Sequence, residues 1–320
     1  MAAGLAAPLV VAVGGGLVSA FFYLSVLFGG FGALILGYLA PLPLFLVGLW
    51  LGAPTAVIAG LTGGAAVLLG TSGSALVSVA YLLTGAVPAM LVVRQSLLAR
   101  VDSAGNLEWY PSGRVLLGLV GMGVAAVLVA MSLAFDQPGG LEGVVRRMLA
   151  QLAEPLFSAQ GLAAPGPEAV WMAAALPGLV VISWIVMTVV NAALAQGALM
   201  RFGRNRRPPM RMGALELPVW LLPVFAMALL GALGLPDAFG FLAVNLALIL
   251  AVPFAFAGLS VVHHLAAQRR SAPVPLLVGF YVVLFLFGWP ILLLVGLGMI
   301  EQWIGLRRRF DRAAPGQEDE

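Results

Sequence analysis

Residues Arg201–Glu216 read RFGRNRRPPMRMGALE, and the rest of the chain can be oriented from this stretch. It contains two adjacent prolines and no acidic residue before Glu216. Apolar runs of bilayer length, Pro177–Met200 and Leu217–Leu235, lie on either side of it. Arginine-rich loops between membrane-spanning helices stay on the cytoplasmic side during insertion. The stretch therefore predicts a cytoplasmic basic loop, whose arginines are Arg201, Arg204, Arg206, Arg207 and Arg211.

The composition predicts a helical membrane protein. Of the 320 residues, 62% are hydrophobic and 9% are charged, and the mean hydropathy is +1.07. A soluble globular chain has about 25% charged residues. The strands of a transmembrane β-barrel alternate in polarity, whereas the apolar runs here are continuous. We therefore predict an all-α polytopic bundle with about eight to nine membrane segments of about 20 residues each.

The order of apolar and polar stretches predicts one integral membrane domain over residues 1–310. N-terminal helices occupy 1–135, an outer segment occupies 136–169, and C-terminal helices occupy 170–310. Residues 311–320 form an acidic tail that we expect to be disordered.

The outer segment is predicted to contain an amphipathic helix. Apolar residues recur at helical spacing from Leu141 to Phe157, and charged and amide side chains occupy the rest of the helical wheel. We expect this helix to lie in the outer membrane interface. The alternative is a lid over a cavity between helices.

Two apolar segments contain helix breakers. Pro41-Leu42-Pro43 predicts a kink, or two short helices, within Phe31–Leu51. A single crossing of Val274–Trp303 would leave Arg307–Arg309 outside, against the arginine bias of the other loops. Gly288-Trp289-Pro290 could instead turn the segment back, but each half is shorter than a normal span. We favour a cytoplasmic C-terminus and leave the path of this segment open.

Polar residues within the apolar spans are candidate solute contacts, because such residues are costly in lipid unless they face protein or water. Tyr23, Tyr38, Asn191 and Asn245 are the candidates. The alternative for each is a hydrogen bond between helices. Glu216 is grouped with the basic loop as a candidate for interaction and topology, and its alternative role is a helix cap paired with Arg211.

Several chemistries lack their usual residues. The chain has no cysteine, which excludes disulfides and thiolate metal sites. His263 and His264 are adjacent and so lack the i, i+4 spacing of a shared metal site. There is no glycine-rich phosphate loop with a lysine and no G-x-S-x-G element. We expect no enzyme activity, no metal or other cofactor, and no nucleic-acid partner.

Three C-terminal stretches are LELPVWLLP (Leu215–Pro223), GLSVVHHLA (Gly258–Ala266) and GLGMIEQWIGLRRRF (Gly296–Phe310). They resemble conserved stretches of the YybS-like (DUF2232) family of bacterial multi-pass membrane proteins. Glu301 stands at or beside the place of the family's acid, and Arg307–Arg309 match its basic run. The departures are Glu for Asp, and Leu306 in place of an aromatic residue.

The resemblance implies a likeness to the S components of energy-coupling-factor importers. The expected function is then a small-solute-binding or transport subunit in the bacterial inner membrane that relies on a partner protein for energy. The alternative is a non-transporting scaffold in envelope growth or division, which recruits partners through the cytoplasmic basic loop.

Overall fold

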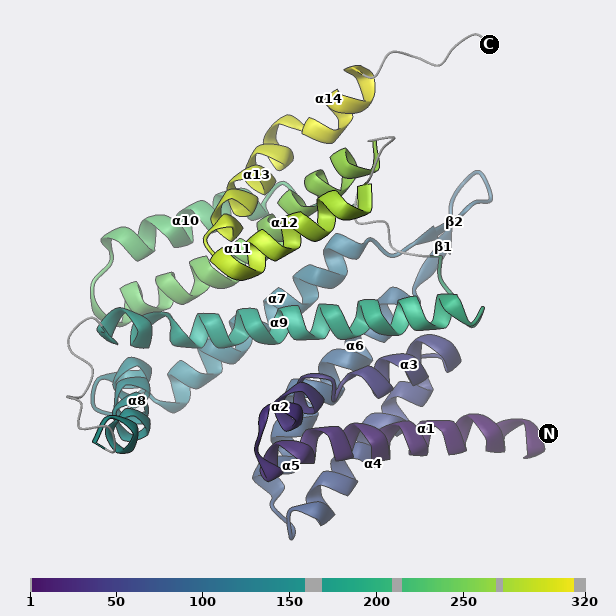
Figure 1. Cartoon of the computed structure of the whole chain (residues 1–320), viewed down its shortest axis with the longest axis horizontal. Coiled ribbons are helices and arrows are strands. Elements are labelled where there is room, and N and C mark those ends of the chain that lie inside the picture. The colour runs from purple at the N-terminus through teal and green to yellow at the C-terminus, as the bar shows by residue number, and fades with distance from the viewer. Residues whose placement is uncertain (1, 159–168, 209–214, 269–272, 314–320) are drawn as a thin grey trace. The chain divides into compact units, whose positions relative to one another are not determined.

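The computed structural model describes residues 2–158, 169–208, 215–268 and 273–313 (Figure 1). Helices make up nearly all of the described chain, and its strands form one short antiparallel hairpin, so the predicted all-α architecture is confirmed. The elements are α1 (Ala2–Leu24), the 3-10 turn η1 (Ser25–Phe28), α2 (Phe31–Tyr38), α3 (Leu42–Leu51), α4 (Ala53–Gly70), α5 (Ala75–Tyr81), the π-helical turn η2 (Leu82–Ala86), α6 (Val87–Ser96), β1 (Ala99–Val101), β2 (Leu107–Trp109), α7 (Ser112–Leu133), α8 (Gly140–Ser158), α9 (Ala169–Arg201), α10 (Leu221–Gly234), α11 (Asp237–Ala267), α12 (Pro273–Phe287), α13 (Pro290–Ile304) and α14 (Leu306–Ala313).

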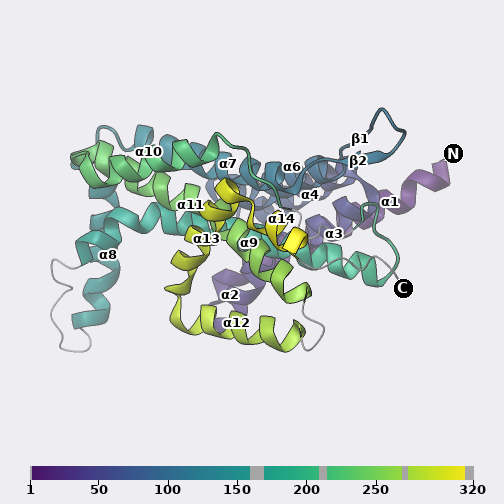
Figure 2. The ribbon, with the colours of Figure 1, turned by 90° about the horizontal axis from the view of Figure 1, so that it is seen from above.

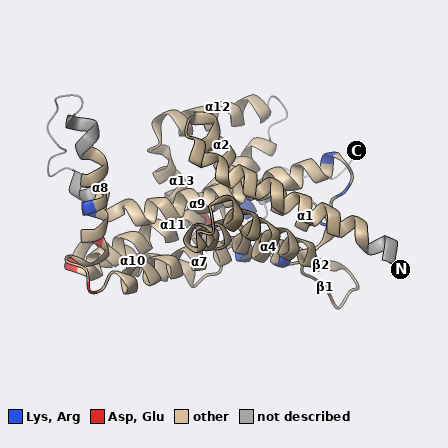
Figure 3. Ribbon diagram, turned by 90° about the horizontal axis from the view of Figure 1, so that it is seen from below, with Lys and Arg blue, Asp and Glu red and all other residues tan. Residues whose placement is uncertain are grey.

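Seven helical stretches of the described chain are long and apolar enough to cross a bilayer. Most of the described ribbon is tan in Figure 3, because it carries neither basic nor acidic residues. Three further apolar helices, α10, α12 and α13, are shorter than a full span. The chain is therefore a multi-pass membrane protein. The seven stretches are Ala6–Phe28, Phe31–Leu51, Ala53–Gly70, Ala75–Ser96, Ser112–Leu133, Met172–Arg201 and Asp237–Ala267.

The chain divides into two compact units, and each is described by itself. Unit 1 contains Met1–Leu119 and Ser183–Met210, and unit 2 contains Val120–Ile182 and Arg211–Glu320. Helices α7 and α9 each contribute a part to both units. The organisation into a single domain stays a prediction.

Small residues let the helices of unit 1 approach closely. A methyl group at Gly16 of α1 would overlap the carbonyl oxygen of Ala59 in α4, and α1 and α4 lie side by side in Figure 1. On α4, the Tyr81 hydroxyl occupies the place where a side chain at Gly63 would stand. Such close contact is typical of helix pairs in membranes. The hydrophobic effect does not drive helices together in lipid, so association depends on van der Waals packing, and small residues allow the backbones to approach closely.

The helix breaks of unit 1 lie where prolines were found in the sequence. Helix α2 ends at Tyr38 and α3 begins at Leu42, which confirms the break predicted at Pro41-Leu42-Pro43. The span Ala75–Ser96 is also irregular, since the π-helical turn η2 separates α5 from α6. Both breaks leave backbone groups without a partner in their own helix, and other helices must supply one.

Unit 2 is built on α11. Helices α10 and α11 pack against each other, with the rings of Phe225 and Phe254 5.0 Å apart. Helix α13 crosses α11 so closely that a methyl group at Gly298 would overlap the carbonyl oxygen of Phe254, and one at Gly258 that of Leu294. Helix α8 forms where the amphipathic helix was predicted, at one end of this unit (Figure 2). Its place in a membrane interface stays a prediction.

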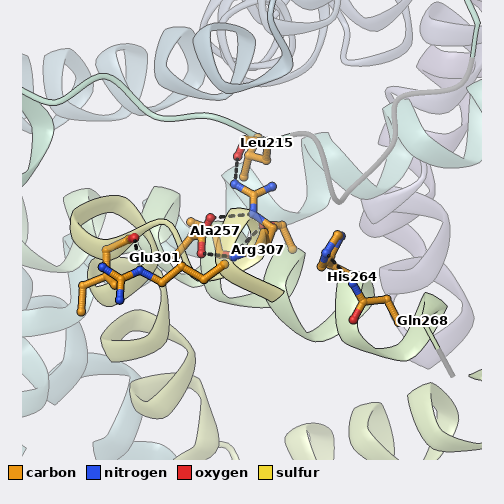
Figure 4. Close-up of polar contacts among 9 residues, drawn as sticks. Leu215, Ala257, His264, Gln268, Glu301 and Arg307 are labelled. Atoms are coloured by element: carbon orange, nitrogen blue, oxygen red, sulfur yellow. Dashed lines mark hydrogen bonds and ion pairs between the residues drawn. The ribbon is translucent and has the colours of Figure 1, made fainter. Parts of the chain in front are cut away.

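The structure defines the path that the sequence left open at the C-terminal end. The segment is two helices, α12 and α13, separated at Gly288, whose φ of +66° favours glycine. The end of α13 and the start of α14 lie against the segment of chain that leads into α10. Arg307 Nη2 donates to the Leu215 carbonyl at 2.7 Å (Figure 4). Gln302 Nε2 donates to the carbonyl of Pro218 at 2.7 Å. Within unit 2, Arg307 therefore lies at the same end as Leu215.

Candidate functional site

The described part of the basic loop is fixed to unit 1 by Arg207. Its guanidinium group donates to two carbonyl oxygens, that of Ser96 at the end of α6 (3.1 Å) and that of Tyr110 just before α7 (3.0 Å). Its own carbonyl accepts hydrogen bonds from Gln196 Nε2 at 3.0 Å and Asn205 Nδ2 at 3.1 Å. The side chain and backbone carbonyl of one residue thus join the end of α6 and the last turns of α9 to the start of α7.

Arg207 is the buried member of the arginine group. Its exposed fraction is 9%, and desolvation by burial lowers the pKa of its guanidinium group. An arginine pKa begins so far above neutrality that the group stays protonated. No carboxylate lies within ion-pair distance of it among the described residues. Its charge is stabilised by carbonyl dipoles and by the Trp109 ring, whose centroid lies 5.8 Å from Cζ.

The other described arginines of the loop remain exposed. Arg204 lies over the ring of Trp50 with 4.3 Å between Cζ and the ring centroid, which places it at the end of α3. A Cβ at Gly52 would lie 3.2 Å from Nη1 of Arg206, so this arginine also borders the α3–α4 turn. Arg201 ends α9 and is exposed. Arg201, Arg204 and Arg206 have no carboxylate within ion-pair distance among the residues described.

These contacts bring the loops after α3, α6 and α9 to one end of unit 1. The stretch Arg94–Arg114 and the basic loop therefore meet at a common end of unit 1. The cytoplasmic side of this end stays a prediction. Arg211 lies outside the described residues. Glu216 lies in unit 2 and is exposed.

Tyr38 and Asn191, two of the candidate solute contacts, meet at the break between α2 and α3. In a regular helix the Tyr38 carbonyl would accept from the N–H of Leu42, which instead donates to Leu39. Asn191 Nδ2 donates to the freed Tyr38 carbonyl at 2.7 Å and to Met187 of its own helix at 2.8 Å. The Tyr38 hydroxyl lies 2.8 Å from Ser183 Oγ, so α9 contacts this break twice.

The amide of Asn191 is only partly satisfied. Its side chain is 1% exposed, and none of the described residues donates a hydrogen bond to its Oδ1 atom. An unpaired acceptor at this depth costs free energy, so it marks a place where a water or a bound molecule would be stabilised.

Tyr23 lies elsewhere in unit 1. Its ring packs edge-on against Tyr81, with centroids 5.2 Å apart. The Tyr81 hydroxyl lies 2.8 Å from Ser19 Oγ, and Ser19 donates to the Ala40 carbonyl at 2.6 Å. This buried chain of hydroxyl groups connects α1 and α5 to the end of the α2 break.

Asn245 belongs to unit 2 and ties α11 to α9. Its Oδ1 accepts from the N–H of Gly178 at 2.6 Å, and its Nδ2 donates to the carbonyls of Ala174 at 2.9 Å and Phe241 at 2.7 Å. Ala174 and Gly178 are the i, i+4 pair of a regular helical turn, so the Asn245 amide reaches across one turn of α9 beside Pro177. Both of its donor protons are used between or within helices.

Within unit 1, the structure therefore brings Tyr38 and Asn191 together and places Tyr23 elsewhere, whereas Asn245 belongs to unit 2. Two cavities stand out, of about 330 Å³ beside the β1–β2 hairpin and about 580 Å³ between α7 and α8. None of the four candidates lines either one. Their role as solute contacts stays a prediction.

One polar contact and one unpaired polar atom among the described residues were not predicted from the sequence. Trp184 Nε1 donates to the Thr84 carbonyl at 2.6 Å. The signal was Pro88, since Thr84 would otherwise accept from the N–H of residue 88, which proline lacks. In unit 2, Gln302 Oε1 is a buried acceptor without a donor.

Glu301 forms an ion pair with an arginine nearby in the chain. Its Oε1 lies 2.7 Å from Arg307 Nε, and Oε2 accepts from the Arg307 backbone N–H at 3.1 Å (Figure 4). The two side chains are 7% and 13% exposed. This buried ion pair fixes the start of α14 to the end of α13.

No group of three metal-ligating side chains occurs among the residues that the structure describes. His263 Nε2 lies 2.8 Å from the Tyr281 hydroxyl on α12, and His264 contacts Gln268. The two histidines therefore serve different contacts.

No protein-family model, curated protein or solved structure matches this chain.

Proposed function

We propose that this protein is a membrane-embedded docking protein of the bacterial inner membrane, which recruits an acidic protein partner through the exposed arginines of its basic loop. The observation that carries the proposal is that one arginine of the loop is buried while the other described ones are exposed. Arg207 is buried and hydrogen-bonded to two elements, whereas Arg201, Arg204 and Arg206 are exposed. These contacts hold the described part of the loop, residues 201–208, and a segment that is already ordered loses little conformational entropy when a partner binds.

The charge of the exposed arginines favours an acidic partner. Guanidinium groups bind carboxylates through paired hydrogen bonds, and these three have no carboxylate partner among the described residues. Arginine retention on the cytosolic side supports placing this end of unit 1 in the cytoplasm. The partner is then a cytosolic protein or the cytosolic part of a membrane protein.

Site-specific photocrosslinking tests the proposal. A photoreactive amino acid replaces Asn205, which is exposed between Arg204 and Arg206. In cells, this variant is expected to give a discrete crosslinked product. The peptide that the partner contributes to that product is expected to be rich in Asp and Glu. Changing Arg201, Arg204 and Arg206 to Gln is expected to abolish that product.

The matched control changes Arg308 and Arg309 to Gln, because both are exposed arginines that are not part of the basic loop. This control is expected to keep the product. A product that persists in the triple variant, or that carries no acidic partner peptide, would show that the loop is not a docking site for an acidic protein.

A second candidate function is a solute-binding subunit energised by a partner, and one specific observation favours it. The unpaired Asn191 Oδ1 atom lies beside the break between α2 and α3. Interrupted helices in transporters supply backbone groups to substrates near the bilayer midplane. The proposed ligand is a small polar solute with an N–H or O–H donor, near Tyr38 and with Tyr23 more distant in the same unit.

Solute uptake separates the two functions. Under the solute-binding proposal, Asn191→Ala impairs uptake, whereas the triple arginine variant leaves solute binding by the purified protein intact. Under the docking proposal, Asn191→Ala leaves the Asn205 crosslink in place.

We also propose, on the C-terminal stretches, that the chain belongs to the YybS-like (DUF2232) family. The Glu301–Arg307 pair supports this assignment, because it gives the family's acid and basic run a joint structural role. The absence of enzyme activity stays a prediction.

A further inference from the structure

A pocket of about 330 Å³ lies between the β1–β2 hairpin and the first turn of α7, all within unit 1. The residues that line it combine aromatic and apolar groups with charged ones. They are Leu98, Ala99, Arg100, Glu108, Trp109, Tyr110, Pro111 and Arg114. The Tyr110 carbonyl, which accepts from Arg207, lies at its border.

The hairpin has one apolar and one charged face. Val101 pairs with Leu107 and Arg100 pairs with Glu108, so the two pairs point to opposite faces. Val101 is 67% exposed and Leu107 is 56% exposed. Neighbouring Leu98 is also exposed. Exposed apolar residues next to the start of a membrane span are typical of a segment that lies on the bilayer surface.

The pocket carries more positive than negative charge. Arg100 is paired with Glu108 at 2.7 Å between Nε and Oε2. Arg114 is exposed and has no carboxylate within ion-pair distance among the residues described. It also lies in the first turn of α7, where the helix dipole already disfavours a cation and favours an anion. An anion bound here would be stabilised by the charge of Arg114 and by the dipole of α7.

We propose that this pocket binds the headgroup of an anionic membrane phospholipid. Its phosphate contacts the Arg114 guanidinium and the first turn of α7, and Trp109 and Tyr110 lie at the level of the glycerol backbone. Tryptophan and tyrosine favour this depth because one end of each ring is apolar and the other polar. The lipid chains then follow α7, whose apolar span begins at Ser112. The apolar part of the lining and this position favour a lipid over free phosphate.

Native mass spectrometry of the purified full chain tests the proposal, with phosphatidylglycerol and phosphatidylcholine as probes. The wild-type protein is expected to bind phosphatidylglycerol at least about tenfold more tightly. Arg114→Gln is expected to remove most of that preference, since a charge-assisted hydrogen bond corresponds to about tenfold in affinity. Arg114→Lys is expected to keep part of it.

The matched control is Arg94→Gln, which neutralises an arginine at the end of α6 that does not line the pocket. The control is expected to keep the preference, and all variants must elute and unfold like the wild type. Equal lipid binding by Arg114→Gln and wild type overturns the proposal. So does complete competition by inorganic phosphate, which would identify a free-phosphate site. The crosslink at Asn205 depends on other arginines, so either proposal can fail alone.

Discussion

At the scale of single residues, the buried amides of this protein serve helix contacts. Asn245 was recognisable in the sequence as a polar residue within an apolar span, but its partners Ala174 and Gly178 were not. The reason is physical: a side-chain amide finds its partner through tertiary packing, at a separation of 67 residues in the case of Gly178. Only Pro177, a local helix breaker, hinted that this turn of α9 needs an external partner.

We predict that Asn245→Leu lowers the free energy of unfolding by about 1 kcal/mol. Two hydrogen bonds to α9 are lost, and interhelical hydrogen bonds average about 0.6 kcal/mol each in membranes. The loss stays modest because Ala174 and Gly178 can then bond to each other. Thermal or denaturant unfolding in detergent measures it, with Gln137→Leu at an exposed position after α7 as the control. An unfolding free energy equal to that of the wild type would show that the amide contacts contribute nothing net.

Asp102 gives a pH-dependent prediction for the hairpin turn. Its carboxylate accepts from the backbone N–H of Asn106 at 2.8 Å and of Ala104 at 2.9 Å. These hydrogen bonds, that from Asn106 first, lower its pKa below the ordinary value. The stabilisation of the turn is therefore complete above the ordinary aspartate pKa of about 3.9 and is lost as the pH falls through the lowered folded value.

Amide chemical shifts of Ala104 and Asn106 in the detergent-solubilised protein, followed from neutral to acid pH, measure this transition. In Asp102→Asn the acid transition is expected to disappear, because the amide does not titrate. An unchanged transition in that variant would assign it to another group.

At the scale of elements, proline-containing breaks were predictable and close helix crossings were not. The breaks at Pro41–Pro43 and Gly288–Pro290 follow from local backbone chemistry. The β1–β2 hairpin escaped prediction, because strands of three residues are too short to show alternation. Its turn residues, Asp102 to Asn106, were the available signal. Glycine spacing could not distinguish a crossing from a chance pattern in a chain with 40 glycines.

Two glycines on α13 allow a test of which glycines lie at a helix crossing. A methyl group at Gly298 would overlap the carbonyl oxygen of Phe254, whereas one at Gly296 meets no atom within 4 Å. Gly298→Ala is expected to separate α13 from α11 and to lower the free energy of unfolding by about 1–3 kcal/mol, as overpacking does. Gly296→Ala, on the same helix, is expected to be neutral or slightly stabilising. Equal unfolding free energies for the two variants would contradict the close crossing.

At the scale of the whole molecule, two loops lie on the same side of the membrane when an even number of membrane crossings separates them along the chain. Helix α7 leaves the hairpin end of unit 1 and α9 returns to the basic loop. Arg207 contacts both of those ends, so the two loops lie at the same end of unit 1. The sequence left the path of the C-terminal segment open, because the contact between Arg307 and Leu215 joins residues far apart in the chain.

The absence of cysteine allows a direct test of sidedness. Single cysteines at the exposed positions Ser103, Asn205 and Arg309 are expected to react with a membrane-impermeant maleimide only after the inner membrane is opened. A cysteine at Gln137, which follows α7, is expected to react in intact spheroplasts. The physical reason is that the retained arginines hold the first three positions in the cytosol, while one crossing separates Gln137 from the hairpin. Reaction of Asn205→Cys in intact spheroplasts would place the basic loop outside, and a cytosolic acidic partner could not then reach it. Reaction at Arg309→Cys alone would leave the loop in place and show that α12 and α13 together cross the membrane.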